Sequence, residues 1–154
     1  MYTVDSSLMD IDPTIKEFIE RARIARLATA NSESKPHLVP VVFVFDGNHF
    51  FIPIDEKRKK TIKPENLKRV KNINENPNVA LLIDEYSEDW TKLTFVLIQG
   101  KASIVNKSQE ENTQLQEAYK KLMTKYPQYQ EIGLGEMCII IKPEKVVSWR
   151  NSQS

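Results

Sequence analysis

Two apolar runs separated by a three-residue turn constrain the fold of this chain most strongly. Residues 37–45 and residues 49–54 are rich in β-branched and aromatic side chains, and Asp46-Gly47-Asn48 lies between them. Such side chains favour strands, and a glycine adopts the positive φ of a tight turn at little cost. The pattern predicts two antiparallel strands joined as a hairpin.

A proline interrupts each arm of this hairpin. Pro40 lies in the first run and Pro53 in the second. Because proline has no N–H to donate to a neighbouring strand, each one predicts a sheet edge, a bulge or a strand end. Two such breaks in facing arms predict an irregular part of the sheet, where a ligand could reach backbone amides.

The rest of the chain is also expected to form mostly strands, with a few helices between them. Further strands are expected at residues 24–30, 79–84, about 93–105, 137–142 and 145–150, with a bend at Gly100. Helical spacing of apolar residues predicts helices at residues 13–23, 64–74 and 108–126. About seven strands in mostly hairpin order close most easily as an antiparallel barrel. The expected fold is mainly β, a barrel with about three flanking helices.

Length and composition narrow the class of protein. The 154 residues fit one domain, expected at residues 12–150 after a loose N-terminal arm at residues 1–11. No apolar run reaches 18 residues, so no membrane span is expected. No signal peptide is visible and the single Cys138 cannot form an internal disulfide, which together predict a cytoplasmic location. A net charge of +1 argues against broad nucleic-acid binding.

A local basic run stands out against this balanced charge. Residues 55–61 read Asp-Glu-Lys-Arg-Lys-Lys-Thr and directly follow an expected strand. In extended backbone Lys57 and Lys59 share one side, and two ammonium groups can clamp a phosphate. Lys60 and Thr61 could add to that site. A solvated lysine-rich turn is the alternative reading of the same residues.

No metal site and no catalytic side chain are expected. His37 and His49 are the only histidines and lie on separate expected strands, without cysteine or carboxylate at ligand spacing. Trp90 and Trp149 are either core residues or covers for a flat aromatic ligand or a partner subunit.

Six segments in order resemble a known family. They are 25–29 (Ala-Arg-Leu-Ala-Thr), 36–43 (Pro-His-Leu-Val-Pro-Val-Val-Phe), Asp55-x-Lys57-x-Lys59, Lys71-Asn72-Ile73-x-x-Asn76-Pro77-x-Val79, Asp84-x-Tyr86-x-x-Asp89-Trp90 and Val146-x-x-Trp149-Arg150. Through them residues 13–150 resemble the pyridoxamine 5′-phosphate oxidase-like split barrels that bind FMN or a deazaflavin. The loop at residues 84–90 is most similar to the subgroup that uses the deazaflavin coenzyme F-420.

The resemblance implies a homodimer of six-stranded antiparallel split barrels of the FMN-binding type, with FMN or coenzyme F-420 bound at the dimer interface. The second and third strands would contact the ring, the basic run would hold the phosphate, and the other subunit would close the site. The implied cofactor-binding residues are Val39, Pro40, Val41, Val42, Ile52, Ile54, Lys57, Lys59, Lys60, Thr61, Trp90 and Trp149.

The function implied is hydride transfer between this cofactor and a small organic substrate. The cofactor supplies the chemistry, so no catalytic side chain is needed. Residues 148–152 read Ser-Trp-Arg-Asn-Ser and lack the family's arginine–x–histidine substrate motif, so oxidation of pyridoxamine phosphate itself is not expected. A non-catalytic carrier or sensor of flavin or haem is the alternative.

Overall fold

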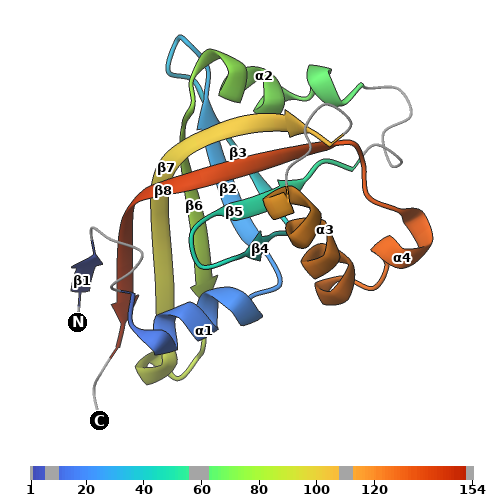
Figure 1. Cartoon of the computed structure of the whole chain (residues 1–154). Coiled ribbons are helices and arrows are strands. Elements are labelled where there is room, and N and C mark those ends of the chain that lie inside the picture. Colours follow the sequence, from blue (N-terminus) through green and yellow to red (C-terminus); the bar gives the residue numbers. More distant parts are fainter. Residues whose placement is uncertain (1, 6–10, 56–62, 108–112, 152–154) are drawn as a thin grey trace.

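The computed structural model describes residues 2–5, 11–55, 63–107 and 113–151, and its main feature is one antiparallel sheet (Figure 1). Seven strands follow one another in the order β3-β2-β6-β7-β8-β5-β4, and β1 pairs with β8. The strands are β1 (Tyr2–Asp5), β2 (Ala25–Ala30), β3 (Pro36–Val41), β4 (Val44–Phe45), β5 (Phe50–Pro53), β6 (Asn78–Glu85), β7 (Thr94–Asn106) and β8 (Met137–Arg150).

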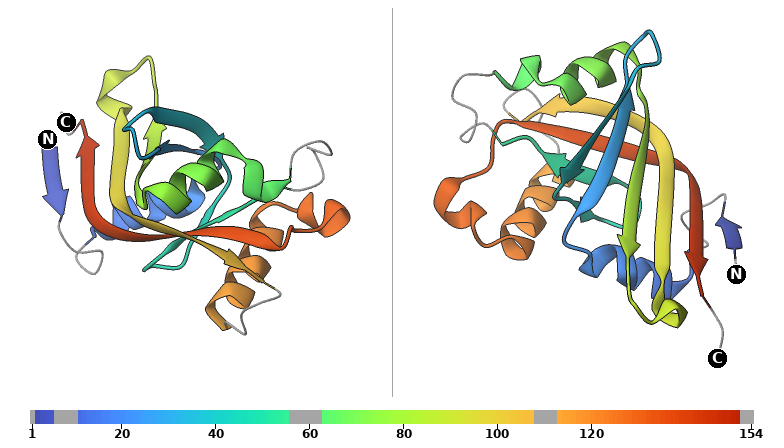
Figure 2. Two further views of the ribbon diagram at one scale, coloured as in Figure 1. Left: turned by 90° about the horizontal axis from the view of Figure 1, so that it is seen from above. Right: turned by 180° about the vertical axis from the view of Figure 1, so that it is seen from behind.

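The sheet curls around an apolar interior, and helices cover its openings (Figure 2). The helices are α1 (Pro13–Arg21), α2 (Lys68–Glu75), α3 (Thr113–Lys125), α4 (Tyr129–Ile132) and the 3₁₀ turns η2 (Pro64–Asn66) and η3 (Trp90–Lys92). The prediction of a mainly β, antiparallel fold with flanking helices is confirmed. None of the helices in the described parts of the chain is long and apolar enough to cross a membrane.

The expected six-stranded count is wrong, because the described residues form eight strands in one sheet. The run 37–45 divides into β3 and β4, which lie at opposite ends of the strand order. β3 pairs with β2, whereas β4 pairs with β5, so only Val44 and Phe45 form the predicted hairpin. The N-terminal arm also differs from expectation, since Tyr2–Asp5 pairs with β8.

The expected break between two C-terminal strands is a bulge inside one long strand. Gln99 pairs with Lys145 and Gly100 pairs with Pro143, so Glu144 has no residue opposite it. A bulge accommodates a proline, which has no N–H for the ladder. The bend predicted at Gly100 is confirmed by this irregularity in register.

Alternation along the strands directs one set of side chains into the core. Leu27, Leu81 and Ile98 are 0% exposed. On β2, β6 and β7 the buried positions alternate with more exposed ones, as expected for strands with one face inward. The helices bury the apolar faces expected of them, as Phe18 and Ile19 of α1 show. Asp12 caps α1 as predicted, because its carboxylate accepts the N–H of Thr14 at 2.8 Å.

Candidate functional site

The outward side of the sheet is apolar where a solvated sheet would be polar. Cross-strand pairing aligns Leu38 with Ala28 and Ala28 with Ala80, and aligns Leu82 with Leu97. Because their neighbours along each strand point into the core, these side chains point outward. We define the outer face as Ala28, Leu38, Pro40, Ala80, Leu82, Phe95, Leu97 and Trp149.

The described part of the chain leaves the outer face only partly covered. Leu38 is 67% exposed, Pro40 is exposed, and the other residues of the face are half-buried. Contiguous exposed apolar surface of this kind marks binding and interaction sites. The main charges on it, Arg26 and Asp84, form an ion pair with each other, which neutralises the net charge of that part of the sheet.

One end of the outer face is hollowed. A depression of about 410 Å³ lies over β2, β6 and β7. Its walls include Ala28, Ala80, Gln99, Gly100 and Glu144. The volume of the depression lies within the range of small-molecule sites. Several of its lining residues are alanine or glycine, which leave this part of the surface open. The depression could admit part of a flat ligand or a side chain of a partner.

The other end carries the two tryptophans. Trp149 stacks on Phe95 with ring centroids 6.0 Å apart, and both belong to the outer face. Trp90 is 65% exposed, and its indole N–H donates to the Tyr86 hydroxyl at 3.5 Å. The backbone carbonyl of Trp90 accepts from the Asn151 side chain at 2.8 Å. These aromatic surfaces are therefore held in place but not buried.

The residues expected around the cofactor ring are divided between surface and core. Pro40 lies on the outer face and Val39 turns toward the core, half-buried. Val41, Ile52 and Ile54 are at most 8% exposed in the main core. The side chains of these three pack inward, so only their backbone could meet a ligand.

Val42 lies apart from the outer face. Together with Asp55, Tyr126 and Tyr129 it lines a separate recess of about 230 Å³ beside the start of the basic run. Lys57, Lys59, Lys60 and Thr61 lie outside the described residues, so their contribution to a phosphate site stays a prediction.

Arg69 on α2 is a further candidate for anion binding. Its side-chain Nε is buried and has no hydrogen-bond partner among the described residues. Burial lowers the pKa of its guanidinium, and the nearby Asp55 carboxylate opposes that shift. On the same helix, the Asn72 side chain donates to the Thr29 hydroxyl at 3.0 Å, while its buried Oδ1 has no partner in the described chain. Buried polar atoms usually find partners, and these two atoms are exceptions among the described residues.

Sequence reasoning missed most of the outer face, although one signal was present. Val79-Ala80-Leu81-Leu82-Ile83 is apolar at every position, not only at alternate ones. In an antiparallel sheet, where one face is commonly solvated, such a run indicates that both faces are covered. Only the register shows which residues of the neighbouring strands share that second face.

The fold and this face define a mainly β protein whose curled antiparallel sheet leaves an apolar outer side available to a ligand or a partner. The chain belongs to the pyridoxamine 5′-phosphate oxidase family, whose model matches residues 11–150, and this confirms the resemblance. A search among curated proteins found no match.

Solved structures agree on the fold. HutZ, described as the heme storage protein from Vibrio cholerae, has 17% sequence identity and a TM-score of 0.67, with 88% of this chain and 92% of that chain covered. A FAD-binding protein from Mesorhizobium loti has 17% identity and a TM-score of 0.64, with 96% and 95% covered. A FAD-binding protein from Mycobacterium smegmatis has 17% identity and a TM-score of 0.60, with 91% and 95% covered.

Proposed function

We propose that this protein binds FMN or the deazaflavin coenzyme F-420 between two copies of the chain and transfers hydride to or from a small organic substrate. The observation that carries the proposal is the apolar outer face, in a member of a family whose structural neighbours include FAD-binding proteins. A tricyclic ring is flat and largely apolar, so it suits such a face better than a polar groove.

The edge of the sheet offers groups that suit the cofactor. β3 ends the strand order, and the described residues place no strand on its other side. An edge strand presents unpaired N–H and C=O groups, and Pro36 and Pro40 remove two of the N–H donors. The remaining groups could bond to the polar rim of the ring, while the positive charge of Arg69 on α2 would attract the anionic chain.

In this proposal the cofactor and the protein have separate roles. The bound cofactor supplies the hydride acceptor or donor. The protein would hold the phosphate through Lys57, Lys59 and Arg69, orient the ring by backbone hydrogen bonds along β3, and exclude water with apolar side chains. In this scheme no side chain needs to exchange a proton with the substrate.

A homodimer would join elements that one protomer keeps apart. Figure 1 shows α2 at one end of the sheet and the β6–β7 loop, which carries Trp90, at the other. A two-fold axis through the outer face would place the tryptophans of one protomer near the basic end of its partner. Each site would then combine a phosphate clamp with an aromatic cover.

We expect the double substitution Lys57→Ala and Lys59→Ala to weaken binding of FMN or coenzyme F-420 by about ten- to a hundredfold. Loss of one charge-assisted phosphate contact costs about 1.5–3 kcal/mol, which corresponds to that range. Titration followed by cofactor fluorescence measures it. The control is Lys16→Ala with Lys120→Ala, which removes two exposed cations from α1 and α3. Unchanged affinity in the first variant, or equal loss in the control, would refute the phosphate clamp.

Haem carriage is the second candidate, favoured by the similarity to the heme storage protein from Vibrio cholerae. The chain has only two histidines to serve as an axial ligand. His37 is half-buried on edge strand β3, and the His49 Nδ1 lies 3.0 Å from the amide nitrogen of Gln114. Cys138 is a poor ligand because burial raises the pKa of its thiol to about 12.

Titration with FMN, coenzyme F-420 and haem separates the two functions. Under the haem hypothesis, we expect haem to bind most tightly and the His37→Ala or the His49→Ala variant to lose the shifted Soret absorption band. Under the leading proposal, both variants retain their affinity for the flavin-type cofactor, and a nicotinamide or other small donor reduces it. A bound cofactor that no donor reduces would indicate a carrier.

A further inference from the structure

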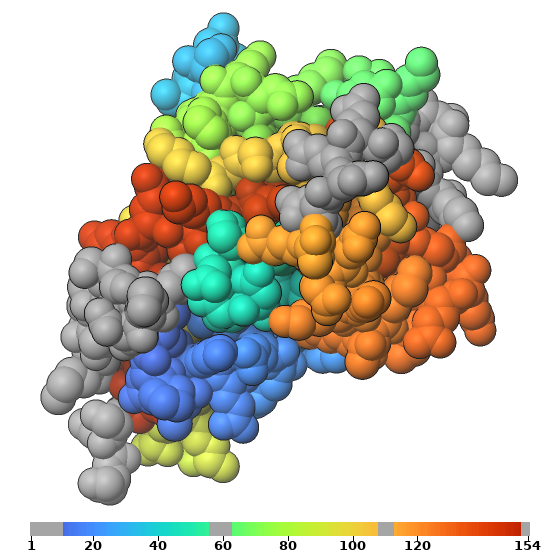
Figure 3. Space-filling model, in the orientation of Figure 1, coloured from blue at the N-terminus to red at the C-terminus, as the bar shows by residue number. Residues whose placement is uncertain are grey.

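A third hollow lies on a different part of the molecule. α1, the β4–β5 hairpin and α3 meet on the face seen in Figure 3, and a cavity of about 480 Å³ lies between them. Its lining consists of Glu20, Val44, Phe45, Lys120, Lys121, Thr124 and Lys125. None of these residues belongs to the outer face, so the hollow is separate from the proposed cofactor site.

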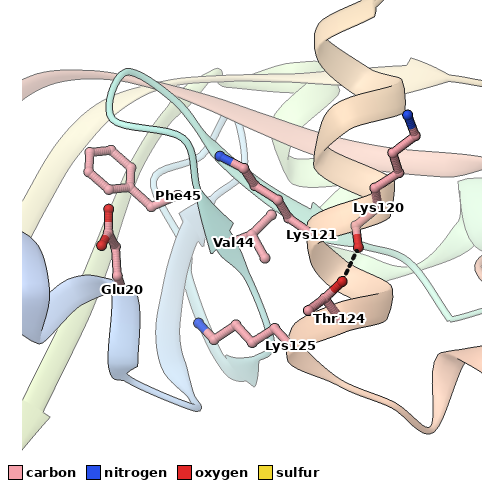
Figure 4. A pocket seen from close by; sticks show the side chains of 7 residues that line it. All are labelled: Glu20, Val44, Phe45, Lys120, Lys121, Thr124 and Lys125. Carbon is pink, nitrogen blue, oxygen red and sulfur yellow. Dashed lines mark hydrogen bonds between the residues drawn. The ribbon is translucent and has the colours of Figure 1, made fainter.

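The cavity combines an apolar wall with an excess of positive charge, since three lysines and one glutamate line it. Val44 and Phe45 are 4% and 6% exposed and form the wall on the sheet side. In Figure 4 the ammonium groups of Lys121 and Lys125 extend across the cavity on the side of Phe45 and Glu20. Among the described residues, neither lysine forms an ion pair, and Glu20 lies 3.9 Å from Lys16.

Lys120 provides an internal comparison. It occupies the same stretch of α3, but its ammonium group points away from the cavity in Figure 4 and lies 3.4 Å from the carboxylate of Glu117. α3 therefore carries one lysine that is paired on the surface and two that extend across the cavity and form no ion pair among the described residues.

Lys125 is held in a constrained position. Its Nζ donates to the carbonyl of Phe43 at 3.0 Å and lies 4.0 Å from the centre of the Phe43 ring. Burial and the positive charge of Arg23 lower its pKa to about 8, while Glu20 opposes that shift. The ammonium has three donors, and the one hydrogen bond that it forms within the described residues, to the Phe43 carbonyl, uses one of them. An anion brought into the cavity would offset the repulsion between these cations.

We propose that this cavity binds a small organic anion, with its acidic group between Lys121 and Lys125 and its apolar body against Val44 and Phe45. The cavity volume matches that of metabolite-sized ligands. Lysine binds carboxylate and phosphate as a point charge, so both acids share this chemistry, and a dianionic phosphate gains more from two cations than a carboxylate does.

Calorimetric titration of the full chain at pH 7 tests the proposal with phenyl phosphate, benzoate and the neutral analogue benzamide. We expect phenyl phosphate to bind most tightly, benzoate more weakly, and benzamide weakest. The Lys125→Met variant keeps the apolar stem of the side chain and should weaken phenyl phosphate binding roughly tenfold, as loss of one charged contact predicts. Lys121→Met should act similarly, and Lys120→Met should change the affinity by less than about twofold.

Three results would overturn this assignment. They are the absence of measurable binding for all three probes, equal binding of benzamide and phenyl phosphate, and an equal loss of affinity in Lys120→Met. A Glu20→Gln variant provides a gain-of-binding check, since removal of the carboxylate should strengthen phenyl phosphate binding. These titrations require no flavin-type cofactor, so their outcome is independent of the proposed oxidoreductase function.

Discussion

The Leu38→Asp variant is expected to dissociate the proposed homodimer, with the dimer dissociation constant rising about a thousandfold. Leu38 is 67% exposed in the single chain and lies on the outer face. The substitution should therefore leave the fold intact but place a carboxylate in the interface. Two-fold symmetry buries two such charges, and at about 2 kcal/mol each the total reaches about 4 kcal/mol. Sedimentation equilibrium measures the change, and thermal unfolding checks the fold.

Binding of the cofactor should be lost with the dimer, because each proposed site needs residues from both protomers. The matched control is Gln116→Asp, which introduces the same charge at an exposed position on α3, away from the outer face. The interface would be assigned wrongly if Leu38→Asp dimerised like the unmodified protein. A wild-type chain that stayed monomeric at every concentration, with and without cofactor, would argue against the dimer itself.

Local patterns in the sequence were sufficient for the three longer helices and most of the strands, although they missed β1 and α4. The apolar spacing of Ile15, Phe18 and Ile19 identified the buried side of α1, and Asp12 followed by Pro13 located its start. These signals depend on residues within one or two turns of each other, so no tertiary information is needed. Gly100 was similarly recognisable as a bend within a long strand.

Strand partners could not be read in the same way. Residues 37–45 form one continuous β-prone run, yet β3 and β4 pair with different strands. The division depends on how the whole sheet curls, which no property of these nine residues specifies. The opposite error occurred near Pro143. The proline was interpreted as the end of a strand, but it lies at a bulge inside one continuous strand.

The candidate site was only partly predictable for the same reason. Pro40 was selected for its missing N–H, and it does lie on the edge strand and the outer face. Ile52 and Ile54 belong to a run with aromatic and β-branched residues at successive positions, and both side chains are in the core. Because such a run is apolar at successive positions, its pattern does not show which side chains point into the core. The outer face can be recognised only when the pairing of five strands is known.

We expect the Gly100→Ala variant, which adds a single methyl group, to lower the free energy of unfolding by about 3 kcal/mol. A Cβ on Gly100 would overlap the backbone carbonyl oxygen of Lys142 and lie 2.9 Å from the Cα of Pro143. Backbone atoms in a paired strand cannot turn aside as a flexible side chain can, so the overlap must be relieved by separating β7 from β8. Overpacking of this kind typically costs about 1–3 kcal/mol, and sometimes more. Urea unfolding followed by circular dichroism measures the loss.

Two further alanine variants show whether the close approach of β8 is responsible. Ser103→Ala changes an exposed position on the same strand and should alter stability by less than about 0.5 kcal/mol. The new Cβ of Gly47→Ala would make only an ordinary contact, 3.9 Å from the Lys16 Nζ, but φ is +97°, so the change should cost about 1 kcal/mol from backbone strain alone. A Gly100→Ala loss no larger than that of Gly47→Ala would mean that β7 and β8 separate easily. Because Gly100 also lines the depression on the outer face, a shift of these strands should also weaken the proposed dimerisation and cofactor binding, whereas Gly47→Ala should leave both unchanged.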